Sequence, residues 1–179
     1  LASKSKERTK QSPSLKARAL RLLSLREYSR KELSTKLNES EKRRVQRDKS
    51  RKAAESESDS DNSISTRASD MEIEAVLNDF EQRGWLSDTR FAEALVRRRS
   101  ERFGVRRIQD ELGRAGIDPE KSVSLLNSLR ETEYQRAHEL WMRKFGAVAG
   151  DQKERARQYR FLASKGFSAD VVVKIVSGR

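Results

Sequence analysis

Three separated stretches of the chain share one spacing of apolar and basic positions. In each, two large apolar residues follow an alanine at the third and fourth positions, and a base follows at the seventh. The stretches are Ala19–Arg26, Ala92–Arg99 and Ala137–Lys144. This spacing places the apolar residues and the base on one face of an α-helix. The recurrence predicts a helical unit that is repeated three times.

Further signals predict where the helices of each unit begin and end. Isolated glycines that can close a last helical turn at positive φ are Gly84, Gly116, Gly146 and Gly166. Ser12–Pro13 fits a helix start, and three pairs fit the capping box, namely Ser29 with Glu32, Ser69 with Glu72, and Thr132 with Gln135. We therefore expect helices at about 13–27, 29–40, 69–83, 88–102, 105–115, 119–130, 132–145, 151–165 and 168–177. The predicted fold is all-α, an elongated tandem array of three three-helix repeats.

The repeat spacing exposes an insertion in the first unit. The first two alanines of the pattern are 73 residues apart, whereas the second and third are 45 apart. The excess corresponds to a low-complexity segment at about 41–66, which is first basic and then acidic and serine-rich. We favour a solvated spacer that is dispensable for folding, and its basic half can extend the second helix. A nucleic-acid-binding arm or a phosphorylated serine cluster is the alternative.

These observations give a domain organisation. A basic tail at 1–12 precedes repeat 1 at 13–86, which contains the insertion. Repeat 2 is expected at 87–130 and repeat 3 at 131–179.

Composition limits the possible functions. Hydrophobic residues make up 34% of the 179 residues and charged residues 38%, so one large core is excluded. There is no cysteine, and the one histidine, His138, has no nucleophile or metal-ligand pattern around it. No glycine-rich phosphate loop occurs. We expect a non-enzyme without cofactor or metal, cytoplasmic and not in a membrane, since no apolar run is long enough to span one.

The net charge of +12 is concentrated near the N-terminus, where residues 1–38 carry eleven bases and three acids. This favours a polyanionic partner, nucleic acid or acidic protein, over a tail that only aids solubility. Two basic clusters are candidate contact sites. The first is Lys16, Arg18, Arg21, Arg30 and Lys31, which we assign to nucleic acid. The second is Arg98, Arg102, Arg106 and Arg107, whose interleaved acids suit a protein surface.

The base on each apolar face has two interpretations. Arg26, Arg99 and Lys144 can extend past the core and bond helix-end carbonyls, which is the interpretation we prefer. They can instead form a repeated basic row that contacts a partner. Trp85 and Trp141 are expected to pack between helices.

The chain contains, in order, Arg26, Ser29, Glu32, Gly84, Trp85, Ala92 and Gly116, and in this order and spacing it resembles the RecX family of bacterial recombination regulators. The resemblance spans about residues 15–176 and is loosest in the third unit. Its first part is Ala19, Leu22, Leu23 and the run Arg26, Glu27, Tyr28, Ser29, Arg30, Lys31, Glu32 and Leu33. The remainder is Ile73, Val76, Leu77, Gly84, Trp85, Leu86, Ser87, Asp88, Phe91, Ala92, Arg99, Gly104, Leu112, Gly116 and Ile117. The insertion departs from the compact family pattern.

The resemblance implies a mainly negative regulator of the RecA recombinase. Such a protein binds in the groove of the RecA–DNA filament and restrains its growth, ATP hydrolysis, strand exchange and co-protease activity, and several family members also bind DNA. We expect a monomer that binds RecA on DNA and, weakly, single- or double-stranded DNA alone. The alternatives are a stand-alone helix-turn-helix-like DNA-binding module, with the helix from Ser29 or Val105 in the major groove, and a purely structural adaptor.

Overall fold

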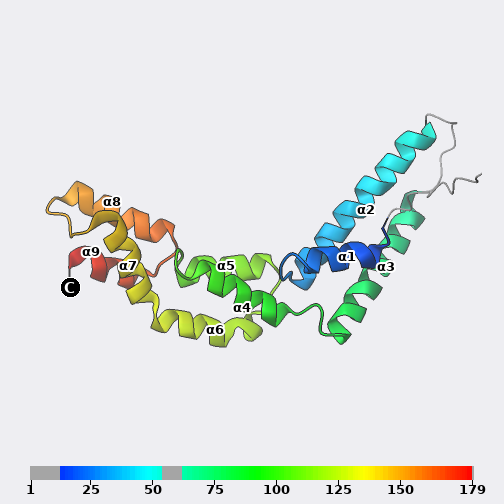
Figure 1. The fold of residues 1–179 in the computed structure, drawn as a ribbon. Coiled ribbons are helices and arrows are strands. Elements are labelled where there is room, and N and C mark those ends of the chain that lie inside the picture. The colour runs from blue at the N-terminus through cyan, green and yellow to red at the C-terminus, as the bar shows by residue number, and fades with distance from the viewer. Residues whose placement is uncertain (1–12, 54–61, 179) are drawn as a thin grey trace, which may run out of the picture. The chain divides into compact units, whose positions relative to one another are not determined.

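A computed structural model of the chain describes residues 13–53 and 62–178, and for 51–53 and 62–68 it describes the backbone alone. Within these ranges all regular structure is helical, in nine helices (Figure 1). They are α1 (Leu15–Leu23), α2 (Arg30–Ala53), α3 (Asn62–Gln82), α4 (Asp88–Arg99), α5 (Val105–Arg114), α6 (Pro119–Glu131), α7 (Glu133–Phe145), α8 (Gln152–Ser164) and α9 (Ala169–Ser177). The prediction of an all-α array of three-helix repeats is confirmed for the described part of the chain.

The helix bounds differ most from expectation in the first repeat. α2 continues to Ala53 rather than ending near residue 40, and α3 begins at Asn62 rather than near 69. The basic half of the predicted insertion therefore extends α2, because it contains neither glycine nor proline. The acidic stretch at 54–61 and the basic tail at 1–12 lie outside the described residues.

Three of the predicted helix starts are wrong in detail. α1 is capped by Ser14, whose hydroxyl accepts from Ala17 N at 3.2 Å, so the helix begins after Pro13. Ser69 lies inside α3, since that helix begins earlier. Thr132 precedes α7, but its hydroxyl donates to carbonyls of α6 and does not cap α7. The four predicted glycine stops all have φ between +69° and +83°, so they are confirmed.

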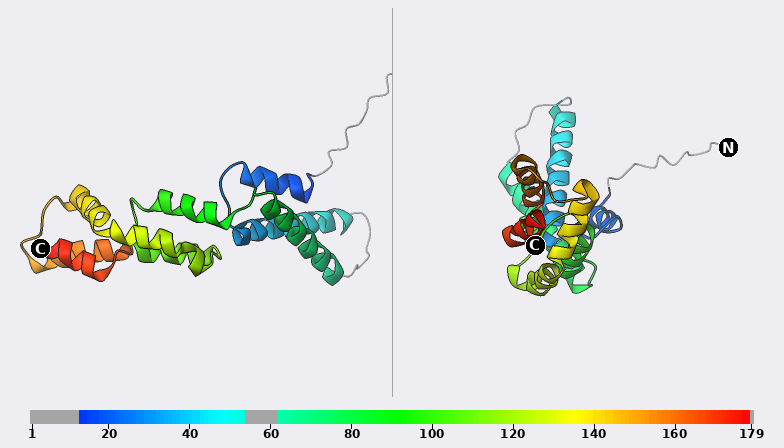
Figure 2. Two further views of the ribbon diagram at one scale, coloured as in Figure 1. Left: turned by 90° about the horizontal axis from the view of Figure 1, so that it is seen from below. Right: turned by 90° about the vertical axis from the view of Figure 1, so that its left-hand side faces the viewer.

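The chain divides into two compact units. Among the described residues, the first contains 13–26, 33–53 and 62–85. Its core consists of fully buried residues of α1, α2 and α3, namely Ala19, Leu33, Leu37, Ile73, Leu77 and Phe80. α1 packs beside α3 (Figures 1 and 2), and Lys16 pairs with Asp79 across them at 2.5 Å. Hydrogen bonds from Lys16 and Arg83 hold the pKa of Asp79 below its usual value.

The second unit contains residues 27–32 and 86–179. Repeats 2 and 3 each have their own core within it. α4, α5 and α6 enclose a cluster around Phe91, Leu95, Ile108 and Leu112, whereas α7, α8 and α9 enclose one around Trp141, Leu162 and Val172. Separate small cores explain how a chain with few apolar residues folds, because each repeat buries only a thin apolar face. The three pattern alanines are at most 1% exposed, and Trp141 is buried, as predicted.

Candidate binding surfaces and repeat junctions

Two junctions with matching chemistry organise the second unit. At the first junction, residues 28–31 pack against repeat 2. Ser29 is fully buried, and its hydroxyl accepts from Glu32 N at 3.0 Å and donates to Ala115 O at 2.7 Å. The carboxylate of Asp88, in the first turn of α4, accepts from Arg30 N at 2.8 Å. A first-turn backbone N–H of α2 is therefore satisfied by a side chain from α4.

The second junction repeats this arrangement between repeats 2 and 3. Gly104 takes the place that Ser29 has at the first junction, and its N–H donates to Lys165 O at 3.0 Å. Glu133, in the first turn of α7, accepts from Val105 N at 2.8 Å and is buried. Glu133 precedes Ala137 by the same four residues that separate Asp88 from Ala92. Asp88 is one of the residues that carry the family resemblance, whereas Glu133 is not, although its shared offset from a pattern alanine could have identified it.

The second junction is closer than the first. A Cβ atom at Gly104 would lie 2.2 Å from Gly166 O, a backbone atom that cannot move away alone. The side chain of Arg136 adds a further tie, because its guanidinium donates to Ser100 O at 2.6 Å, Phe103 O at 2.9 Å and Leu129 O at 2.8 Å. Burial lowers the pKa of Arg136. This residue therefore joins the end of α4 and the end of α6 to α7.

The junctions also engage the starts of the two helices that a helix-turn-helix module would place in DNA. A recognition helix contacts base edges with its N-terminal residues. In this protein the start of α2 is occupied by the contacts of Ser29 and Asp88, and the start of α5 by those of Gly104 and Glu133. Val105, the first residue of α5, is only 6% exposed. The first residues of α2 and α5 are therefore engaged within the protein, although the next two residues of α5, Arg106 and Arg107, are exposed.

The first basic cluster is divided between the two compact units. Lys16, Arg18 and Arg21 belong to the first compact unit, whereas Arg30 and Lys31 belong to the second. Arg18 is half-buried and donates to Ser40 Oγ at 2.8 Å and to the carboxylate of the buried Glu41. Lys16 is paired with Asp79. Two of the five candidate bases are thus already neutralised inside the fold.

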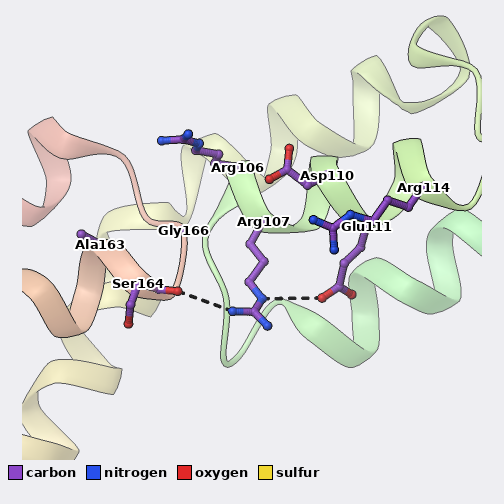
Figure 3. Close-up of a pocket in the computed structure, with 8 residues that line it drawn as sticks. All are labelled: Arg106, Arg107, Asp110, Glu111, Arg114, Ala163, Ser164 and Gly166. Atoms are coloured by element: carbon purple, nitrogen blue, oxygen red, sulfur yellow. Dashed lines mark hydrogen bonds and ion pairs between the residues drawn. The ribbon is translucent and has the colours of Figure 1, made fainter.

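The second basic cluster lies at the end of α4 and the start of α5. Arg98, Arg102 and Arg106 are exposed, and among the described residues none of the three has a hydrogen-bond or ion-pair partner for its side chain. Arg107 lines a hollow of about 340 Å³ between α5 and the end of α8, together with Arg106, Arg114 and Glu111 (Figure 3). Its guanidinium lies 3.5 Å from Ser164 O and 3.7 Å from Glu111 Oε1. This cluster offers more available positive charge than the first.

The recurring base differs among the repeats. Arg99 donates to Glu111 Oε2 at 2.8 Å and lies 5.4 Å from the centre of the Phe103 ring. Lys144 instead lies over the Phe161 ring at 3.9 Å. Within the described residues neither side chain bonds a helix-end carbonyl, so that part of our preferred interpretation is wrong for these two residues. Arg26 is exposed and does have a partner in the fold.

The remaining motif residues are mostly packed. Tyr28, Leu33, Phe91 and Ala92 are buried. Trp85 was expected to pack between helices, but 43% of it is exposed. Its ring meets the Phe80 ring edge-on, with the ring centres 5.3 Å apart.

The described residues contain no group of three or more histidine, cysteine, aspartate or glutamate side chains arranged to hold a metal. The centre of the His138 ring lies 6.0 Å from that of Tyr134, in a stacked arrangement, and 5.7 Å from that of Trp141. Within the described part of the chain, no helix is both long and apolar enough to cross a membrane.

These features define a class of protein, an all-α array of three-helix repeats. Family models described as "RecX, second three-helix domain" and "RecX, third three-helix domain" match residues 87–121 and 131–176. "Regulatory protein RecX" of Leptothrix cholodnii is 43% identical over 164 residues, which cover 91% of this chain and 87% of the relative. The same-named protein of Herminiimonas arsenicoxydans is 42% identical, with 87% and 85% covered. The chain belongs to the RecX family of regulatory proteins.

The fold agrees with a solved member of that family. The crystal structure of RecX from Lactobacillus salivarius superposes with a TM-score of 0.61 at 19% sequence identity, covering 92% of this chain and 93% of that one. At this identity the likeness supports the fold alone.

Proposed function

We propose that this protein is a mainly negative regulator of RecA that binds the RecA–DNA filament and inhibits its ATPase, strand-exchange and co-protease activities. The observation that carries the proposal is membership of the RecX family, with relatives named regulatory proteins at 43% and 42% identity over most of both chains. The fold is compatible with this role, because an array of helical repeats offers several separate surfaces for binding. A filament likewise presents one subunit surface repeatedly, so several weak contacts can add to a stable complex.

The three arginines of the second basic cluster that lack a partner among the described residues are the surface we propose for the filament. Arg98, Arg102 and Arg106 carry charge that no side chain of the described fold neutralises. Acidic side chains close by in the sequence, such as Glu101 and Asp110, give the surface mixed charge. Such a pattern favours a specific protein partner over any polyanion.

The stand-alone DNA-binding module is the weaker candidate. Its recognition helices would have to insert the residues that follow Ser29 and Gly104 into a major groove, and the junction contacts engage those helix starts. Sequence-selective binding to naked duplex would be its signature.

The direct test is RecA ATP hydrolysis on single-stranded DNA while this protein is added. We expect hydrolysis to fall as the protein is titrated, at stoichiometries below one per recombinase subunit if each molecule contacts several subunits. The variant with Arg98, Arg102 and Arg106 changed to Gln should inhibit less. A matched control changes Arg143, Arg157 and Arg160 to Gln, three exposed arginines of repeat 3. Unaltered hydrolysis with the unmodified protein in excess would contradict the proposal.

A further inference from the structure

Two half-buried phenylalanine rings hold a line of cations across the second junction. Arg107 Cζ lies 4.3 Å from the centre of the Phe103 ring, and Lys165 Nζ lies 5.5 Å from the same centre. Lys165 Nζ is also 5.6 Å from the centre of the Phe161 ring, over which Lys144 Nζ lies at 3.9 Å. These residues come from α5, the end of α8 and the end of α7. We call Arg107, Lys165 and Lys144 the cation strip.

The rings order these side chains without neutralising them. A cation–π contact attracts the charge to a neutral ring, whereas a salt bridge cancels the charge with a carboxylate. Within the described structure, Lys144 and Lys165 have no carboxylate partner, and Arg107 has only the 3.7 Å contact with Glu111, which Arg99 shares. Long basic side chains normally lose considerable rotamer freedom when they bind an anion. Here part of that freedom is already lost in the unbound protein.

The spacing of the strip suits an anionic polymer. Because Arg107 and Lys165 lie 4.3 and 5.5 Å from one ring centre, their charges are within about 10 Å of each other, no more than a Debye length at moderate salt. Lys165 and Lys144 are similarly close across the Phe161 ring. A nucleic-acid strand carries a phosphate at every nucleotide, so one strand can meet all three cations in succession.

We propose that the cation strip is a binding site for the sugar-phosphate backbone of single-stranded nucleic acid. Single-strand sites combine basic charge with aromatic side chains, and here the partly exposed rings of Phe103 and Phe161 lie beside the three cations. A duplex offers its bases only inside the stack, so it would use the charges and not the rings. The inference rests on the proposed function in one respect, that the strand is the DNA on which the recombinase assembles.

The test is fluorescence anisotropy of a labelled oligothymidylate with the full chain at several salt concentrations. The strip variant changes Arg107, Lys144 and Lys165 to Gln. Its control changes Lys121, Arg143 and Lys153 to Gln, which removes one arginine and two lysine charges from the same unit, as the strip variant does. We expect the salt slope of the strip variant to be shallower by up to about 0.7 for each phosphate interaction that is removed, and that of the control to stay near the original. Equal changes in the two variants would overturn the inference.

Phe161→Leu separates the role of the ring from that of the charges. This variant keeps every cation but leaves Lys144 and Lys165 without that ring. Affinity should fall roughly three- to tenfold while the salt slope is unchanged. Phe103→Leu makes the same test at the other ring. Circular dichroism checks that both variants fold. Affinities equal to that of the unmodified protein in both variants would overturn the assignment of an ordering role to the rings.

A labelled polyglutamate peptide distinguishes nucleic acid from an acidic protein. If the strip variant loses polyglutamate binding as much as oligothymidylate binding, the assignment to nucleic acid is wrong. The RecA ATPase assay separates the two proposals. If the unmodified protein inhibits RecA and the strip substitutions leave oligonucleotide binding unchanged, the proposal about the cation strip is wrong and the proposed function holds. If the unmodified protein does not inhibit RecA and the strip variant no longer binds the oligonucleotide, the proposed function is wrong and the proposal about the cation strip holds.

Discussion

The carboxylate of Glu133 accepts a hydrogen bond from the backbone N–H of Val105 at 2.8 Å. The bond joins the first turn of α7 to the first turn of α5, and both residues are buried. Asp88 and Arg30 form the same bond at the other junction. At each junction, therefore, the first helix of one repeat accepts a hydrogen bond from the start of the second helix of the preceding repeat.

We predict that Glu133→Ala lowers the free energy of unfolding by about 1–3 kcal/mol, because it leaves a buried N–H without an acceptor. Chemical denaturation followed by circular dichroism measures the change. Glu131→Ala is the control, since Glu131 is exposed and close in sequence. A loss for Glu133→Ala no larger than that of the control would show that solvent satisfies Val105 N.

Gly104→Ala should destabilise the second junction. The new methyl group would lie 2.2 Å from Gly166 O, so the α5 start and the α8–α9 turn must separate. Overpacking of this kind costs about 1–3 kcal/mol. Gly113→Ala is a matched control, because Gly113 lies inside α5 and a Cβ atom there would have nothing within 4 Å. At that position the added methyl should stabilise by about 0.5–1 kcal/mol. Melting midpoints that move in opposite directions are expected, and equal shifts would contradict the steric argument.

Glu41→Gln should destabilise the first compact unit, although Glu41 lies at the start of the predicted insertion. Its carboxylate is buried against Arg18 and lies 3.0 Å from Arg44 Nε. Loss of its charge leaves the half-buried Arg18 without a counter-ion, which costs about 1–3 kcal/mol. Glu39→Gln, which removes only an exposed pair with Lys36, should cost at most about 1 kcal/mol. Similar unfolding curves for the two variants would restore the simple spacer interpretation from residue 41 onward.

Arg99→Met tests the two interpretations of the recurring base. The Arg99–Glu111 pair is partly exposed, and Glu111 keeps Arg107 nearby. The unfolding free energy should therefore change by no more than about 1 kcal/mol. If Arg99 is structural, inhibition of RecA also persists. Loss of inhibition at unchanged stability would assign Arg99 to the partner contact.

Helix periodicity predicted most of the fold because each repeat buries its own apolar face. Ala19, Ala92 and Ala137 mark three equivalent buried positions. The ends of several helices were predictable because glycine adopts the positive φ that closes a last helical turn. The bounds of α2 and α3 were harder to predict. A polar segment without proline or glycine can continue a helix that is anchored elsewhere, and its composition does not reveal where the helix stops.

The binding surfaces were less predictable than the fold. Charge counts favoured the N-terminal bases, but they cannot show that Arg18 is paired with a buried glutamate. The cation strip joins Arg107 to Lys165 through one phenylalanine ring, and these residues are 58 positions apart. Such a relationship depends on how the helices pack across a junction. Periodicity within one helix carries no information about it.

Co-sedimentation with preassembled RecA filaments tests the central claim most directly. Filaments are formed on single-stranded DNA with a slowly hydrolysed ATP analogue, and the protein is added at about 0.2 M salt, where non-specific phosphate contacts are weakened. Bare DNA of the same length, attached to beads, is the control. We expect the protein to pellet with filaments and to stay largely in solution with bare DNA. Equal recovery with both, or none with filaments, would contradict the account.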